Sequence, residues 1–274
     1  MGSAIKLSTS EGMFQLVMFR SSSIFLAGFL LILVGGFTAS AQQIKSTFHV
    51  REQGIEHYTK GETVNAVTLL LAAVESDKKD VLAWYFLGLS YQRLSQIELA
   101  LSAFDNATKV DPNDYFASLG KLDESEVDAR LVEVRSLLVA AANSAILYIE
   151  LNRAIPRSDL NKWIQRRTRL IDYASLATSA EVTTKARRTT SPFPIFAPAS
   201  GNQKLTVEMS IVLMFAASGK VRVVLFRGVI PPELKSELLN DIEKIGFVPA
   251  TKGGETVSQL KVITFSKQGL KGDH

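Results

Sequence analysis

The residues best suited to chemistry are few and scattered in this chain of 274 residues. Its three histidines, His49, His57 and His274, are not clustered, and it has no cysteine. A disulfide, a thiolate zinc site and a cysteine nucleophile are therefore excluded, and a histidine-based triad or metal site is not expected. We find no phosphate-binding loop, nucleophile elbow, dinucleotide glycine motif or zinc-protease helix. The sequence predicts no enzyme, no metal and no cofactor; an unrecognised hydrolase is the one enzymatic alternative.

Charged residues are unevenly distributed along the chain. The acidic run 123–126 stands at a predicted helix start, where negative charge interacts favourably with the helix dipole, so we do not interpret it as a metal or acid–base site. Residues 111–150 contain eight acidic and three basic residues, whereas residues 157–190 contain eight basic and three acidic residues. We interpret both segments as solvated helix faces, and a polyanion or anionic-lipid surface on the basic segment is the alternative. A net charge of +4 is too small to indicate nucleic-acid binding.

An export signal is predicted over residues 1–41. The uncharged apolar run 24–34 follows Arg20 and precedes Ala39-Ser40-Ala41, which offers a cleavage site before Gln42. The run is too short to span a bilayer by itself. Translation from Met13 or Met18 would shorten the segment before Arg20. A cleaved signal would leave a periplasmic or secreted protein, whereas retention of residues 14–37 would anchor the protein in the inner membrane, facing the periplasm.

A repeat of 34 residues follows the export signal. Gly54, Ala66, Leu70 and Ala73 recur at this offset as Gly88, Ala100, Phe104 and Ala107. The second copy also has Trp84, Leu87, Tyr91 and Pro112. Apolar residues at helical spacing predict helices over about 81–93 and 97–110, and small residues at 88 and 100 allow the two helices to approach closely. This pattern resembles the tetratricopeptide repeat.

Helices continue beyond the two repeats, 47–80 and 81–114, to complete a predicted helical domain over 42–180. The stripe from Val127 to Ile149 predicts a degenerate third repeat or capping helix, with an irregularity at Asn143-Ser144. A further helix is predicted from a Ser158 cap, with Arg166, Arg169 and Asp172 opposite its apolar face. We expect that helix to dock on the end of the solenoid, with a phospholipid surface as the alternative.

The resemblance implies that the concave face of the solenoid binds a peptide or another protein. The matching positions are Arg51, Ile55 and Tyr58 in the first copy and Leu82, Tyr85, Leu89, Gln92 and Arg93 in the second. Tyrosine and arginine often anchor protein interfaces. Contacts with the N-terminal segment or the next helix are the alternative use of these side chains.

A linker over 181–202, with prolines at 192, 194 and 198, precedes a small module over 203–268. Alternation from Val207 to Phe215 and from Val221 to Leu225 predicts a β-hairpin. Pro231-Pro232 opens a helix, and a last strand is predicted over about 259–266.

The order strand, strand, helix, strand resembles the C-terminal domain of TonB-family proteins. The segments 219–222 and 247–250 carry this resemblance, although the Tyr-Pro usual near the start of that domain is absent. The resemblance implies pairing of a partner's extended segment with an exposed strand. Leu260, Val262 and Thr264 of the final strand are the predicted partner-binding residues, and a self-contained fold is the alternative.

The sequence therefore predicts an α+β protein of two domains, an all-α TPR-like solenoid followed by a β-β-α-β module. Its predicted function is that of an exported, non-enzymatic bacterial adaptor, with a protein or peptide in the helical groove and an envelope or outer-membrane protein at the second module. The alternative is a membrane-anchored relative of TonB-family energy transducers that acts on an outer-membrane transporter.

Overall fold

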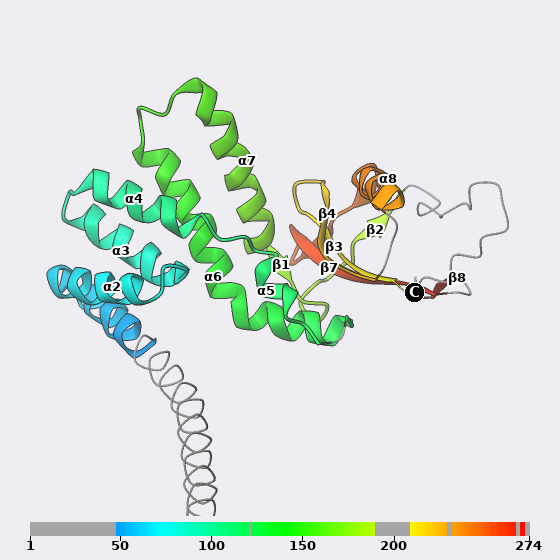
Figure 1. The fold of residues 1–274 in the computed structure, drawn as a ribbon, viewed down its shortest axis with the longest axis horizontal. Coiled ribbons are helices and arrows are strands. Elements are labelled where there is room, and N and C mark those ends of the chain that lie inside the picture. The colour runs from blue at the N-terminus through cyan, green and yellow to red at the C-terminus, as the bar shows by residue number, and fades with distance from the viewer. Residues whose placement is uncertain (1–47, 121, 190–208, 229–231, 267–268, 272–274) are drawn as a thin grey trace, which may run out of the picture.

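The computed structural model describes residues 48–120, 122–189, 209–228, 232–266 and 269–271. Helices occupy the first two thirds of this part, and a sheet with one covering helix follows them (Figure 1). The predicted export signal and the prolines of the predicted linker lie outside the described residues.

Two helical pairs form the predicted repeats. The first helix (48–59) and α2 (Thr63–Ser76) make one pair, and α3 (Val81–Arg93) and α4 (Ile97–Ala107) make the other. Asp80 is the N-cap of α3: its side chain accepts a hydrogen bond from the backbone N–H of Ala83. The prediction for α3 is confirmed at both ends, whereas α4 ends at Ala107, before the expected 110.

Close contacts at two glycines explain the period of 34 residues. A Cβ added at Gly88 would lie 2.5 Å from Cε1 of Phe104, and one added at Gly54 would lie 2.8 Å from Cγ of Leu70. Both distances are shorter than a van der Waals contact, so only glycine permits each helix pair to pack this closely. The same contact thus recurs in both copies, which confirms the helical repeat.

Three further helices extend the array. After the short α5 (Asp114–Ala117), the long α6 (Glu124–Leu151) packs against α3 and α4, and α7 (Arg157–Ala174) returns along α6 (Figure 1). The predicted irregularity in α6 is wrong, because the helix is continuous there and the Ser144 hydroxyl donates to the carbonyl of Ala140. The predicted Ser158 cap is also wrong, because α7 already begins at Arg157, after Pro156.

By length and composition, α6 is apolar enough to cross a membrane. One stripe of its apolar residues lies in the interior of the protein, since Val127, Leu131 and Leu138 are each at most 2% exposed. The core helix of a globular domain has the same composition as a membrane span, so this property is weak evidence for a membrane.

Most of the strands surround the long strand β7. The strands are β1 (Leu176–Ala177), β2 (Arg187–Arg188), β3 (Met209–Phe215), β4 (Val221–Arg227), β5 (Phe247–Val248), β6 (Ala250–Lys252), β7 (Glu255–Ser266) and β8 (Gly269–Lys271). The main path is β1-β7-β3-β4, antiparallel except for the parallel pair β1–β7; β6 and β8 pair with β7, and β2 pairs with β5. Helix α8 (Pro232–Glu243) follows β4, so the predicted order of strand, strand, helix and strand is present.

Strand β3 is buried on both of its faces. Met209, Ile211, Leu213 and Phe215 pack with Leu238 and Ile242 of α8. The alternate residues Val212, Met214 and Ala216 pack in one cluster with Leu131 and Leu138 of α6. The sheet therefore lies between α8 and the helical array, and the helices and the sheet share a hydrophobic core.

The connection between helices and sheet differs from the expected one. The sequence predicts helices to 180 and a linker from 181, but β1 and β2 belong to the sheet module, and the backbone N–H of Thr183 donates to the carbonyl of Thr251 at 2.7 Å. Two-residue strands have no sequence period of their own. Their conformation is fixed by partners that lie far along the chain, Ser258 for β1 and Val248 for β2.

Candidate functional site

The candidate site is a groove of about 710 Å³ in the helical array. It lies where the first helix, the turn between α2 and α3, helix α5 and the first half of α6 meet. It is lined by Phe48, Arg51, Ser76, Asp77, Lys79, Asp80, Val81, Leu82, Tyr115, Arg130, Glu133, Val134, Ser136 and Leu137. A volume of this size accommodates a short peptide segment or a small molecule.

Apolar side chains of the groove are continuous with the core. Val81 belongs to the cluster between α3 and α6, and Leu82 packs against that cluster. Val134 is 5% exposed and belongs to the cluster beneath the sheet, against which Leu137 also packs. Phe48, by contrast, is 53% exposed, and the guanidinium of Arg51 lies 4.6 Å from its ring centroid. The groove thus has firmly held apolar walls and one exposed aromatic side chain at its rim.

Arg51 is fixed by two carboxylates. Its Nη1 lies 3.3 Å from Oδ2 of Asp80, and its Nη2 lies 2.7 Å from Oε1 of Glu52. Both Arg51 and Asp80 are buried, and the other oxygen of Asp80 caps α3. This ion pair therefore ties the first helix to the start of α3, and it leaves the Arg51 guanidinium largely satisfied.

Tyr115 forms the wall that α5 contributes. Burial, and then the nearby carboxylates of Asp80, Asp114 and Asp77, raise the pKa of its hydroxyl to about 12. Within the described part of the chain, that hydroxyl makes no hydrogen bond. It therefore remains a protonated donor at neutral pH, available to a molecule in the groove.

The structure brings only two of the eight predicted concave residues into this groove, Arg51 and Leu82. Ile55 and Leu89 pack against the core of the two repeats, and Gln92 is half-buried. Binding by these eight residues stays a prediction.

Three other predicted residues make contacts within the array. Nη1 of Arg93 donates to the carbonyl of Tyr58 at 2.7 Å, and the guanidinium lies 3.7 Å from the Tyr58 ring centroid. Tyr85 packs against the core of the two repeats and also against the cluster that contains Ala141 and Ala145 of α6. These side chains join one repeat to the next, which is the alternative use that the sequence left open.

The wall formed by α5 and α6 is the part that sequence reasoning missed. Tyr115, Arg130, Glu133 and Leu137 line it. Their signal lies in the predicted stripe of α6, because residues 130, 133 and 137 each stand one position before a buried residue of that stripe and therefore flank its buried face. No such period marks Tyr115, since α5 has only four residues.

The structure corrects the prediction that the final strand is an edge of the sheet. Strand β7 lies inside the main path, between β1 and β3, and on the side away from β3 it pairs with β1 at 258–259 and with β8 at 264–266. Leu260 is 5% exposed in the cluster beneath α6, and Val262 packs against the same cluster. The hydroxyl of Thr264 lies 3.2 Å from that of Ser210 on β3. The sequence does not indicate β1 and β8, which pair with parts of β7, because strands of two and three residues have no period of their own.

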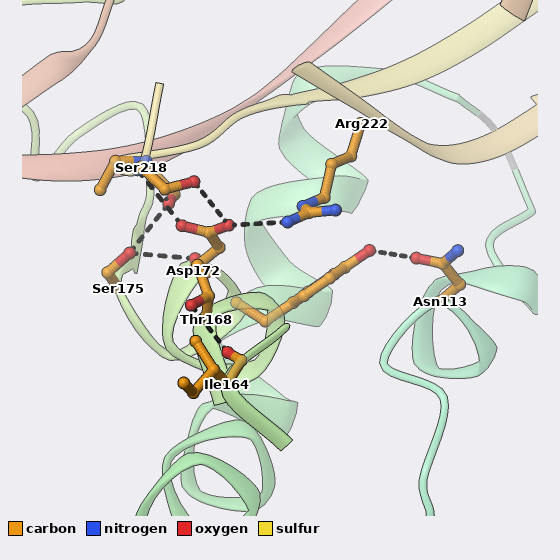
Figure 2. Close-up of polar contacts among 10 residues, drawn as sticks. Asn113, Ile164, Thr168, Asp172, Ser175, Ser218 and Arg222 are labelled. Carbon is orange, nitrogen blue, oxygen red and sulfur yellow. Dashed lines mark hydrogen bonds and ion pairs between the residues drawn. The ribbon is translucent and has the colours of Figure 1, made fainter. Parts of the chain in front are cut away.

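A buried polar cluster joins α7 to the turn between β3 and β4 (Figure 2). The Asp172 carboxylate accepts two hydrogen bonds from Ser218, one from Oγ at 2.8 Å and one from the backbone N–H at 3.3 Å. Oδ2 of Asp172 also lies 3.2 Å from Nη2 of Arg222. The hydroxyls of Ser175 and Ser258 lie 2.8 Å apart nearby. The cluster contains serines and a carboxylate but no imidazole to activate a hydroxyl, so its geometry serves to hold the two parts together.

The acidic and histidine candidates also have structural contacts. The Asp123 side chain accepts from the backbone N–H of Glu126 at 2.9 Å and caps α6. Nδ1 of His57 lies 2.5 Å from Oε2 of Glu62. In the described ranges, no three His, Asp or Glu side chains are grouped so that they could hold a metal ion.

No family model matches the chain, and no curated protein matches it. Among solved structures, the type III secretion chaperone SycD of Yersinia enterocolitica, in complex with a peptide of the translocator YopD, is 14% identical with a TM-score of 0.25, over 46% of this chain and 93% of that one. The first TPR of Spaghetti (RPAP3) bound to an HSP90 peptide is 15% identical with a TM-score of 0.25, over 46% and 94%. The TPR2B domain of yeast Sti1 in its Hsp70 complex is 16% identical with a TM-score of 0.24, over 46% and 95%. Likeness at this level assigns no partner to this chain, and its TPR-like character rests on the repeated glycine contacts described above.

Proposed function

We propose that this chain is a non-enzymatic adaptor that binds a protein or peptide segment in the groove between its helical repeats and α6. The observation that carries the proposal is the groove itself, about 710 Å³, with apolar walls and with two of the sequence-predicted residues in its lining. An apolar concavity with a few polar groups is the usual form of a recognition site.

Site-specific photo-crosslinking in the native cells tests this proposal. A photoreactive residue in place of Lys79, which is exposed and lines the groove, should crosslink one defined protein. The substitution Ser136→Trp fills the groove and should abolish that crosslink, because the partner then has no room. A photoreactive residue in place of Gln165, exposed on α7, is the control and should not capture the same protein. If the adduct persists in Ser136→Trp, the groove is not the binding site.

We further propose that the protein is exported, on the basis of the apolar run 24–34 and the small residues 39–41. The resemblance of the sheet module to the TonB C-terminal domain supports an envelope partner for that module. The intact mass of the protein from fractionated cells decides between the two forms of export. A soluble species that begins at Gln42 supports the adaptor, whereas a membrane-bound species that retains residues 14–37 contradicts it and supports the anchored transducer.

A further inference from the structure

The charges that line the groove cancel. Three cations, Arg51, Lys79 and Arg130, face three carboxylates, Asp77, Asp80 and Glu133. Four of these six side chains already form ion pairs with one another: Arg51 lies 3.3 Å from Asp80, and Arg130 lies 2.9 Å from Glu133. A charged ligand would therefore compete with existing ion pairs without finding a complementary net charge.

The Tyr115 hydroxyl selects the kind of polar group that the groove accepts. It is a donor without a partner among the described residues, and it lines the groove. Burial raises the pKa of this hydroxyl most, and the negative charges of Asp80, Asp114 and Asp77 raise it further. These negative charges repel a further carboxylate brought by a ligand but not a neutral carbonyl, because a carbonyl oxygen brings no net charge.

We infer that the groove binds an uncharged, extended peptide segment, whose apolar side chains contact Leu82 and Leu137 and one of whose backbone carbonyls accepts a hydrogen bond from Tyr115. This inference rests on the proposed function and adds the chemistry of the partner. Acidic segments are rejected at the Tyr115 end, and affinity comes from apolar contact and a neutral hydrogen bond.

Fluorescence anisotropy with synthetic peptides tests the inference on the full protein. The probes are three peptides of about nine residues with blocked ends and the same central Leu-Phe-Leu, flanked by serine and glutamine, by glutamate, or by lysine. The neutral peptide should bind most tightly, and the glutamate peptide should bind at least about tenfold more weakly. Raising the salt from about 50 mM to about 500 mM should change the neutral peptide's Kd by less than about twofold.

A conservative variant identifies the hydrogen bond. Tyr115→Phe should weaken the neutral peptide about three- to tenfold at an unchanged Tm, because only the hydroxyl is lost. Tyr91→Phe, on α3 outside the groove lining, should leave the affinity unchanged. Tighter binding of either charged peptide, a tenfold loss with salt, equal loss in both variants, or no binding of the neutral peptide would each overturn the inference. Crosslinking at Lys79 is independent of these results, so a partner of other chemistry would still be detected there.

Discussion

At the scale of single residues, Asp172 shows how a charged side chain can join two parts of a fold. The sequence places it opposite the apolar face of α7, with Arg166 and Arg169, whereas the structure leaves it 1% exposed. Its partners, Ser218 and Arg222, follow it by about fifty residues and lie on the sheet module. Helical periodicity reports only on contacts that repeat along the helix, so it cannot reveal a partner contributed by a distant turn.

Removal of this carboxylate should destabilise the whole protein. Asp172→Ala leaves the half-buried Arg222 without its carboxylate, so we expect a loss of about 2 to 4 kcal/mol in the free energy of unfolding. Urea denaturation measures the effect. The double variant Asp172→Ala/Arg222→Ala should lose less than the sum of the two single variants. Additive losses would show that the two side chains are not coupled.

At the scale of elements, Glu181 binds side-chain or backbone groups of three segments: α6, the residues after β1, and β6. Its carboxylate accepts from Nη1 and Nη2 of Arg135 on α6 at 2.8 and 2.6 Å, and from the backbone N–H of Thr178 at 2.9 Å. It also lies 3.0 Å from Nζ of Lys252 on β6. The Arg135 hydrogen bonds, followed by the Thr178 N–H, hold the pKa of Glu181 far below its ordinary value of 4.5.

Because the pKa of Glu181 is lowered, the contribution of Glu181 to the free energy of unfolding depends on pH. A carboxylate with a depressed pKa in the folded state adds stability above its unfolded pKa of 4.5, and that stability is lost as the pH falls toward its folded pKa. Glu181→Gln should therefore lower the unfolding free energy by about 1 to 2 kcal/mol at neutral pH and by less near pH 3. Urea titrations of both proteins across this range measure the difference. A difference that stays constant with pH would contradict the assignment.

The elements also show what a sequence can and cannot predict. The bounds of α3 follow from its sequence, because Asp80 caps a helix whose apolar residues keep one period. The groove follows only in part, because Arg51 and Leu82 lie on predicted helix faces while Tyr115 stands on a helix too short for any period. Strand β1 has only two residues, and its pairing with Ser258 and Gln259 depends on the completed fold.

At the scale of the whole molecule, the helices and the sheet share one hydrophobic cluster. Val127, Leu131 and Leu138 of α6 share a cluster with Val212 and other residues of the sheet. Two domains joined by a flexible linker would each bury their own apolar residues, but here the sheet covers a face of α6.

A chain truncated after Thr189 tests whether the helices need the sheet in order to fold stably. Loss of the sheet would uncover Leu131 and Leu138, so we expect a lower Tm and association of the truncated protein, measured by calorimetry and light scattering. Leu131→Gln and Leu138→Gln, introduced together into the truncated chain, should reduce the association. A monomeric truncated protein with the Tm of the full chain would show that the helices fold independently.

The pairing of β1 with β7 also sets an order of events during synthesis. Ala177 pairs with Gln259, about 80 residues later in the chain. At a translation rate of about 5 to 20 residues per second, ~4 to 16 s pass between the synthesis of Ala177 and that of Gln259. Helices from the first helix to α7 can form within that interval because their contacts are local. The sheet cannot close until β7 is made, because β7 pairs with both β1 and β3.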